Sequence, residues 1–375
     1  DVLGSRGLGD VYKRQYQYRI NKYDLDFGPG MSVEMDHNTY SLGATVSQPI
    51  YAGGQIYNNY KAAQVQDKIT EQAEELTTDN IVYSADLNYW TAAARKGMYD
   101  VMCQYVDIVG ELANVLTIRF NDGQISKTDL LQVESRLKEA ELNKSSAYKE
   151  YQIALQNLNS LMGVSPLDPI EVEDSITTYL ALPLQVGEDV ALRNRPDYAI
   201  SELNIEYQKR QINLSKAKYN PSLAIGFQGT WGTPMLNVKG SDQLWTPAVF
   251  ASLKIPLFRW GARFKEVNSQ KAILRSKEYA LDNTRDKIAQ EVANAWTSLT
   301  EYTKQITVAE EACKIAEENL DLNTFSYNEG KLPILDVLSA QLSWIQSYSS
   351  LIQTWYQQKA SLAQYNKAIG IRRLQ

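Results

Sequence analysis

The sequence predicts a mainly helical fold that also contains β-strands and is built from two copies of one unit. Three landmarks recur at an offset of 207 residues. They are residues 48–51 with 255–258, 120–123 with 327–330, and 158–159 with 365–366. Because the offset holds from the first landmark to the last without an insertion, we interpret it as an internal duplication.

Composition excludes several classes of protein. The net charge is −6 and the isoelectric point is near 5.2, which argues against binding of nucleic acid through its phosphates. No run approaches the ~18 consecutive apolar residues of a membrane-spanning helix. Short, alternating strands of a membrane barrel stay compatible with this composition.

Residues that commonly carry chemistry are few. Cys103 and Cys313 are not repeat-equivalent, and we expect buried thiols, with a disulfide in an oxidising compartment as the alternative. The single histidine, His37, has no cysteine or histidine partner nearby, and no phosphate-binding motif follows Gly53-Gly54. The sequence therefore predicts neither an enzyme nor a cofactor or metal site.

Four segments alternate between apolar and small or polar residues, which is typical of strands. They are residues 16–21, 40–48, 221–231 and 249–255. Their lengths approach the ~9–11 residues with which a tilted strand crosses a bilayer, although an ordinary β-sandwich hairpin is the alternative. Turn formers in 27–37 and 233–243 join each pair. Trp231 and Trp245 flank the second loop, where they would either lie at a membrane interface or simply pack.

Two very long helices follow the strands. Residues 54–120 and 261–327 contain no proline, and each would be roughly 100 Å long at ~1.5 Å per residue. In the second copy, apolar residues from Ile288 to Leu320 alternate at spacings of four and three, which predicts a coiled coil. The first copy keeps this seam less strictly, with Asn88 and Arg95 at equivalent positions. Shorter helices are expected to return over 126–161 and 333–369.

The repeat also predicts the organisation of the chain. Residues 16–163 form a first repeat, 164–194 a proline-containing connector, and 195–375 a second repeat that begins with a helix over 195–219. A counterpart of that helix should end near residue 12, but the chain begins with a Gly-rich, non-periodic segment. We therefore expect residues 1–15 to be a non-native leader, joined to a gene that lacks its first helix. The whole chain is expected to form one interlocked domain.

Several motifs occur in a fixed order. Residues 48–54 and 255–261 each end a strand and enter a helix, residues 192–197 precede the second copy, and Tyr327 and Gly330 are followed by 335–338. In this order the motifs resemble the TolC family of outer-membrane efflux factors, over residues 16–370. The resemblance implies a homotrimer in outer-membrane lipid, whose four strands per chain close a twelve-stranded barrel and whose helices continue as a periplasmic α-barrel.

The same resemblance implies a gate and two partners. The helix tips would close the tunnel and dock on a periplasmic adaptor protein served by an inner-membrane pump. The tips are Asn121, Asp122 and Gly123 in the first copy, with Asn328, Glu329, Gly330 and Lys331 in the second. The strand-to-helix turns are Pro49 and Gly54, with Pro256 and Gly261.

Three residues are candidates for the constriction. Three copies of Asp336 would form a carboxylate ring that attracts cations, although a solvated surface aspartate is the alternative. Asp129 is its repeat equivalent, and a helix cap with Ser126 is the alternative for it. Tyr327 resembles the gate tyrosine of the family, whereas Leu332 and Ser339 depart from the pattern of some relatives.

The function predicted from the sequence is a passive outer-membrane channel that exports what an inner-membrane pump delivers. A coiled-coil scaffold of a surface or filament is the alternative. It would explain the long helices but not the four alternating strands placed in register at the heads of two hairpins.

Overall fold

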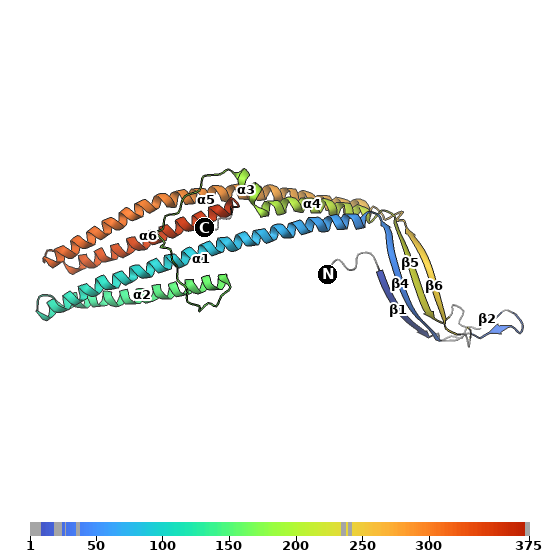
Figure 1. Ribbon diagram of the computed structural model, residues 1–375, viewed down its shortest axis with the longest axis horizontal. Helices are drawn as coiled ribbons and strands as arrows, with labels where there is room; N and C mark the ends of the chain where they lie inside the picture. The colour runs from blue at the N-terminus through green and yellow to red at the C-terminus, as the bar shows by residue number, and fades with distance from the viewer. Residues whose placement is uncertain are drawn as a thin grey trace. The chain divides into compact units, whose positions relative to one another are not determined.

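The computed structural model describes residues 9–18, 25–26, 28–34, 38–233, 238 and 242–371 (Figure 1). His37, discussed above, lies outside the described residues. The chain divides into two compact units. The first unit comprises residues 1–69 and 202–279 and contains a four-stranded sheet, and the second comprises residues 70–201 and 280–375 and is helical.

The helices reproduce the duplication. The long helices are α1, Gln55–Asn121, and α5, Ala262–Asn328, and each has 67 residues. The returning helices are α2, Lys127–Met162, and α6, Ile334–Ala368. Since α1 and α5, like α2 and α6, begin 207 positions apart, the predicted repeat is confirmed in the backbone.

The predicted seam of α5 is buried. Of its ten positions, eight have buried side chains: Ile288, Val292, Ala295, Leu299, Ile306, Cys313, Ala316 and Leu320. Burial raises the pKa of the Cys313 thiol to about 11, and both cysteines are free, which corrects the alternative of a disulfide. By length and composition α1 contains one stretch that could cross a membrane. A third of that stretch is buried within the chain, and Val109 and Leu116 of α1 are fully buried in the helical core.

The connector holds one short helix that the sequence analysis did not predict. Residues 164–194 were expected to form a proline-containing connector, and α3, Glu188–Asn194, lies at their end. Gly187 occupies its N-cap, two acidic residues lie in its first turn and Arg193 lies in its last turn, which suits the helix dipole. Upstream of α3 the connector is held by Asn159 Nδ2, which donates to the Asp168 carbonyl at 2.8 Å.

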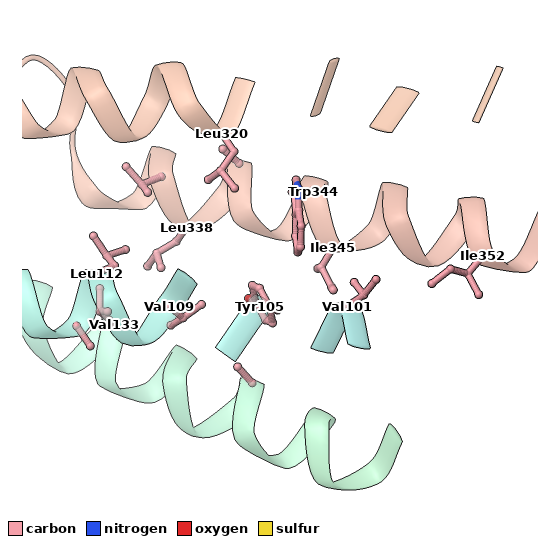
Figure 2. Packing of buried hydrophobic residues seen from close by; sticks show 14 of the residues in the cluster. Val101, Tyr105, Val109, Leu112, Val133, Leu320, Leu338, Trp344, Ile345 and Ile352 are labelled. Carbon is pink, nitrogen blue, oxygen red and sulfur yellow. The ribbon is translucent and has the colours of Figure 1, made fainter. Parts of the chain in front are cut away.

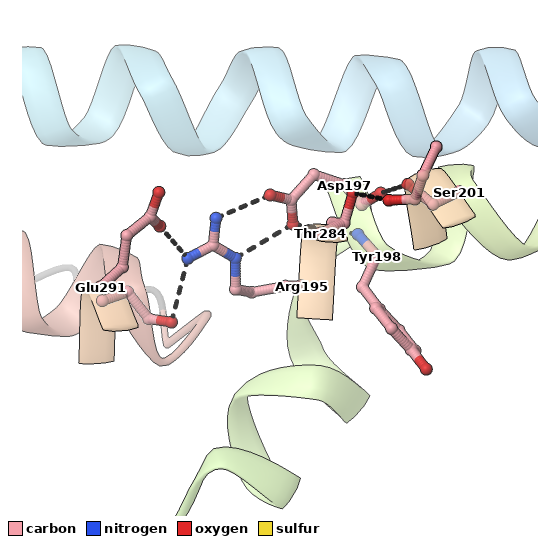
Figure 3. A network of polar contacts seen from close by, with 8 residues as sticks. Arg195, Asp197, Tyr198, Ser201, Thr284 and Glu291 are labelled. Atoms are coloured by element: carbon pink, nitrogen blue, oxygen red, sulfur yellow. Dashed lines mark hydrogen bonds and ion pairs between the residues drawn. The ribbon is translucent and has the colours of Figure 1, made fainter. Parts of the chain in front are cut away.

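A charged network holds the start of the second repeat against α5 and α6 (Figure 3). Arg195 lies between α3 and α4, Pro196–Ala217, and its guanidinium donates two hydrogen bonds to Asp197, at 3.0 and 2.6 Å. It also donates to Glu291 of α5 at 2.6 Å and to the Ala368 carbonyl at the end of α6. Burial opposes the charge of Arg195, but the two carboxylates raise its pKa. The motif at 192–197 is therefore a structural clamp in this protein.

The sheet is antiparallel with the strand order β1-β4-β5-β6. Its strands are β1, Gly9–Tyr18; β4, Asn38–Ala52; β5, Ser222–Gly232; and β6, Leu244–Lys254. Leu42 lies opposite Trp231, and Phe227 lies opposite Val249, so apolar residues of these three strands share one face. The other face carries mainly small or polar residues, as the alternation predicts, with Leu244 and Phe250 of β6 as exceptions.

The first strand departs from the repeat. In the second copy Lys254 pairs with Ser222, and the equivalents of these residues in the first copy are Ser47 and Gln15. Ser47 pairs instead with Gly9. Residues 25–26 and 32–33 form a separate two-stranded sheet, β2 and β3, within the loop that joins β1 to β4. An even-numbered slide keeps the same residues on the same face, so alternation alone could not fix the register. The predicted leader of residues 1–15, part of which lies in β1, stays a prediction.

Candidate gate at the helix tips

The two long helices end in the same backbone geometry. Gly123 and Gly330 have φ values of 74° and 71°, in the left-handed region that glycine adopts without strain. In each tip two hydrogen bonds close the last turn. Gln124 N donates to the Arg119 carbonyl at 2.8 Å, and Lys331 N donates to the Ser326 carbonyl at 2.9 Å. This pattern ends a helix abruptly and leaves the tip residues Asp122, Gly123, Glu329 and Gly330 exposed.

The two candidate carboxylates begin equivalent helices but lie in different surroundings. Asp129 is half-buried, and its backbone N–H donates to Ser126 Oγ at 3.2 Å, so Ser126 caps α2. Asp336 is exposed, and Pro333 occupies its N-cap without a side-chain bond. Neither carboxylate is paired with a cation in the part of the chain that the structure describes. The cap predicted as the alternative for Asp129 thus exists, and it uses the backbone of Asp129.

Tyr327 connects the two hairpins through a residue that the sequence analysis missed. The side chain of Tyr327 is buried, and the guanidinium of Arg119 lies 5.3 Å from the centre of its ring. The same guanidinium donates to Asn328 Oδ1 at 3.0 Å. Arg119 occupies the last turn of α1, where a cation suits the helix dipole. This position is the feature of the sequence that could have identified Arg119 as a tip residue. The repeat equivalent of Arg119 is Ser326, so the second copy has no guanidinium at this position.

An apolar cluster supports the two tips (Figure 2). Leu112 of α1 and Val133 of α2 lie in one cluster with Leu320 of α5 and Leu338 of α6. Further from the tip, Val101 lies in the same cluster as Ile345 and Ile352 of α6. The first hairpin is thereby packed against the second, which brings the predicted residues Asn121, Tyr327 and Asn328 to one end of the helical unit.

The strand-to-helix turns differ between the copies. In the first, Gly53 and Gly54 have φ values of 63° and 91°, and Asn220 Nδ2 donates to the Gly53 carbonyl at 2.9 Å. In the second, Trp260 and Gly261 have φ values of 45° and 72°. Trp260 is the one non-glycine residue with positive φ in the described chain. Pro49 lies within β4, next to a bulge, whereas Pro256 follows the end of β6.

A metal or catalytic centre was not expected. Over residues 9–371, apart from the undescribed gaps, no group of three or more His, Cys, Asp or Glu side chains could hold a metal ion.

Comparison with known proteins defines the class. The fold is that of outer-membrane channels: VceC of Vibrio cholerae superposes with a TM-score of 0.77 at 17% identity, over 97% of this chain and 86% of VceC. The chain belongs to the outer membrane efflux protein family, whose model matches residues 22–164 and 189–371. Membership of this family places the protein in the bacterial outer membrane.

Two relatives extend the comparison. Nodulation protein T of Rhizobium leguminosarum bv. trifolii is 25% identical over 260 residues, which are 67% of this chain and 55% of that protein. The chain therefore spans less than two thirds of that relative. Outer membrane efflux protein BepC of Brucella suis is 20% identical over 346 residues, which are 92% of this chain and 75% of BepC.

Proposed function

We propose that the protein is a passive, homotrimeric channel of the outer membrane, gated at its helix tips. The observation that carries this proposal is an apolar stripe of α5 with nothing packed on it. Val308, Ile315 and Leu322 follow each other at a spacing of seven, and their side chains are 66%, 67% and 66% exposed. They lie on the side of α5 opposite the buried seam, because Ile306 and Val308 are two positions apart.

The duplication supplies the partner of this stripe. The equivalents of Val308 and Ile315 are Val101, which is 8% exposed, and Ile108, and both pack in the cluster with α6 of the same chain. The reverse holds for the returning helices, since Leu338 is 6% exposed and its equivalent, Leu131, is 52% exposed. The surfaces of α1 and α6 that pack together within one chain thus have exposed equivalents on α5 and α2. Pairing α5 of one copy with α2 of the next covers both surfaces and closes a ring.

Closure of the ring would also pair the edge strands of the sheet. The strands β1 and β6 are its edges, and their unpaired backbone groups would be costly in lipid. Four strands from each of three chains would form a barrel with the apolar face of Leu42, Phe227 and Val249 toward lipid. The turns at Pro49, Gly54, Pro256 and Gly261 would then lead each strand pair into its helices.

The tips would form the gate. Three exposed Asp336 side chains around a narrow axis would attract cations and bind a divalent ion, while Asp129 would contribute mainly to the start of α2. The link from Arg119 to Tyr327 and Asn328 would hold the hairpins of each chain together in the closed state. Residues 121–123 and 328–331 are the surface on which we expect the periplasmic adaptor to dock. Energy for transport would come from the inner-membrane pump.

Single-channel recording in a planar bilayer tests this function. The wild-type protein should give small, cation-selective openings that divalent cations block. Asp336→Asn should abolish the block, whereas Asp129→Asn, the matched control, should leave it. Arg119→Ala should increase the open probability relative to Ser326→Ala, its equivalent in the other copy. Folded trimers without conductance would contradict the proposed function, and unchanged block in Asp336→Asn would contradict the position of the ring.

A further inference from the structure

A large cavity lies where the strands meet the helices of the first unit. Its volume is about 960 Å³, within the range of small-molecule sites. Pro49, Ile56 and Tyr60 line it on the side of β4 and α1, and Lys218, Lys254 and Arg259 line it from the other elements. Apolar and aromatic walls with a few cations define an amphiphilic site.

The register of the sheet shows which face the cavity occupies. Lys254 lies opposite Ser222, and Ala224 lies opposite both Pro49 and Ser252. All of these positions belong to the face that carries Ser47 and Thr45, opposite the apolar face of Val46 and Phe227. Leu223, on the apolar face, also lines the cavity, but Pro49, Ser222, Ala224 and Lys254 place it mainly on the polar face of the sheet, which the proposed barrel turns toward its lumen.

The charge of the cavity is unbalanced. Lys218 is neutralised by Glu266 at 2.5 Å, and Tyr219 also donates to this carboxylate, at 2.8 Å. Lys254 and Arg259 have no carboxylate partner within the described ranges, and no carboxylate is among the residues that line the cavity. Arg259 lies over the ring of Tyr219, at 5.8 Å from its centre. Two cations thus face the cavity uncompensated.

The basic character is specific to one half of the repeat. The equivalents of Lys254 and Arg259 in the first copy are Ser47 and Ala52. A proline and a glycine nevertheless keep the same positions in both copies. Each chain therefore contributes one basic turn and one uncharged turn to this level of the molecule.

We propose that this cavity binds amphiphilic organic anions in transit, with their apolar body against Ile56 and Tyr60 and their acidic group at Lys254 and Arg259. The inference rests on the proposed function, because the barrel is what makes the polar face of the sheet a lumen. Charge-assisted hydrogen bonds to Lys254 and Arg259 would orient the anion, and burial of its body would supply affinity.

A fluorescence titration tests the site without requiring conductance. The probe is 1-anilinonaphthalene-8-sulfonate, added to the detergent-solubilised protein, with uncharged N-phenyl-1-naphthylamine for comparison. The double variant Lys254→Gln/Arg259→Gln should bind the sulfonate about tenfold more weakly and the uncharged probe as before. The matched control is Arg263→Gln/Lys265→Gln. These two residues are exposed in the first turn of α5 and lie outside the cavity, so the control should bind like the wild type. Equal affinity of both variants for the sulfonate would overturn the proposal.

A recording in bilayers of zwitterionic phosphatidylcholine distinguishes cargo from lipid as the anion. The sulfonate should block the current in a voltage-dependent manner, because a lumenal site lies within the transmembrane field, and the double variant should lose the block. Binding in solution together with a block that ignores voltage would place the site on the lipid side and overturn a role in transit. If the protein bound the sulfonate but never conducted, the proposed channel function would be refuted and the anion-binding site in the cavity would stand.

Discussion

The two hairpins of this chain have the same backbone and different neighbours. Helices α1 and α5 have equal length and end at equivalent glycines, yet Val101 is buried where its equivalent Val308 is two-thirds exposed. In the single chain, α1 of the first hairpin and α6 of the second bury these positions, whereas the equivalent positions of α5 and α2 are exposed. The difference teaches that the duplication maintains the backbone geometry while the two copies differ in what covers them, which is the basis of the proposed pairing between chains.

The largest effect is expected from one substitution made at both equivalent positions. Val101→Asp places a charge in the apolar cluster and should lower the free energy of unfolding by about 4 kcal/mol. Val308→Asp should leave the fold of the chain intact and abolish the proposed trimer. Thermal unfolding and native mass spectrometry in detergent measure the two effects. If the Val308→Asp protein remained trimeric, the apolar stripe of α5 would not be part of the interface between chains.

The strand-to-helix turns give the second comparison. A Cβ atom on Gly53 would lie 2.6 Å from the Ala217 carbonyl and 2.8 Å from Cβ of Asn220, so Gly53→Ala should cost about 3 kcal/mol. At the equivalent position, Trp260 is 88% exposed, and Trp260→Ala should cost less than about 0.5 kcal/mol. Denaturant titration measures the loss of stability in both variants. Equal losses would contradict the close packing around Gly53 in the first turn.

The returning helices differ in a buried cation. Lys359 of α6 is 1% exposed between Trp90 and Trp355, donates to the Thr178 carbonyl, and has Gln152 as its equivalent in α2. Burial lowers its pKa from 10.5 to about 8, with Asp174 opposing the shift. The unfolded chain therefore binds more protons between pH 8 and 10.5, and stability attributable to Lys359 should rise across this window by about 2–3 kcal/mol.

The control for this prediction is Lys359→Met. Cys313 has a raised pKa and lowers stability between about pH 9 and 11, but it does so in both proteins. The difference between wild type and variant in unfolding midpoint should therefore change with pH in favour of the wild type. Parallel curves from pH 7.5 to 10.5 would show that Lys359 keeps its ordinary pKa.

The smallest effect is expected at the starts of the returning helices. Ser126→Ala removes the acceptor for the Asp129 N–H and should cost about 1 kcal/mol. Pro333→Ala removes no side-chain bond and should change stability by about 0.5 kcal/mol through the unfolded chain. Unfolding in guanidinium measures both changes in stability when the denaturation curves of the two variants are fitted with one common slope. A larger loss for Pro333→Ala would reverse this comparison.

Periodicity explains why much of the fold could be predicted. The seam from Ile288 to Leu320 and the glycines at the tips are local patterns, and the offset transferred them to the first copy. The register of β1 could not be predicted, because a slide by an even number of residues preserves alternation. Arg119 and Lys359 were missed for another reason: their contacts join distant segments, and a cation in a helix is expected to face solvent.

The family and the channel class followed from ordered motifs, but the roles of single gate residues do not follow from order alone. Asp336 and Asp129 are equivalent in sequence, and the structure separates them through the residue that caps each helix, Ser126 or Pro333. The chemistry of the proposed gate would depend on neighbouring chains, which no pattern within a single sequence encodes.

Electron microscopy of the detergent-solubilised protein tests the assembly most directly. Class averages viewed along the tunnel axis should show a ring of six hairpins with three-fold symmetry, in which α5 of each chain lies against α2 of its neighbour. Monomers, or filaments of laterally bundled helices, would contradict a closed trimeric channel and support a coiled-coil scaffold.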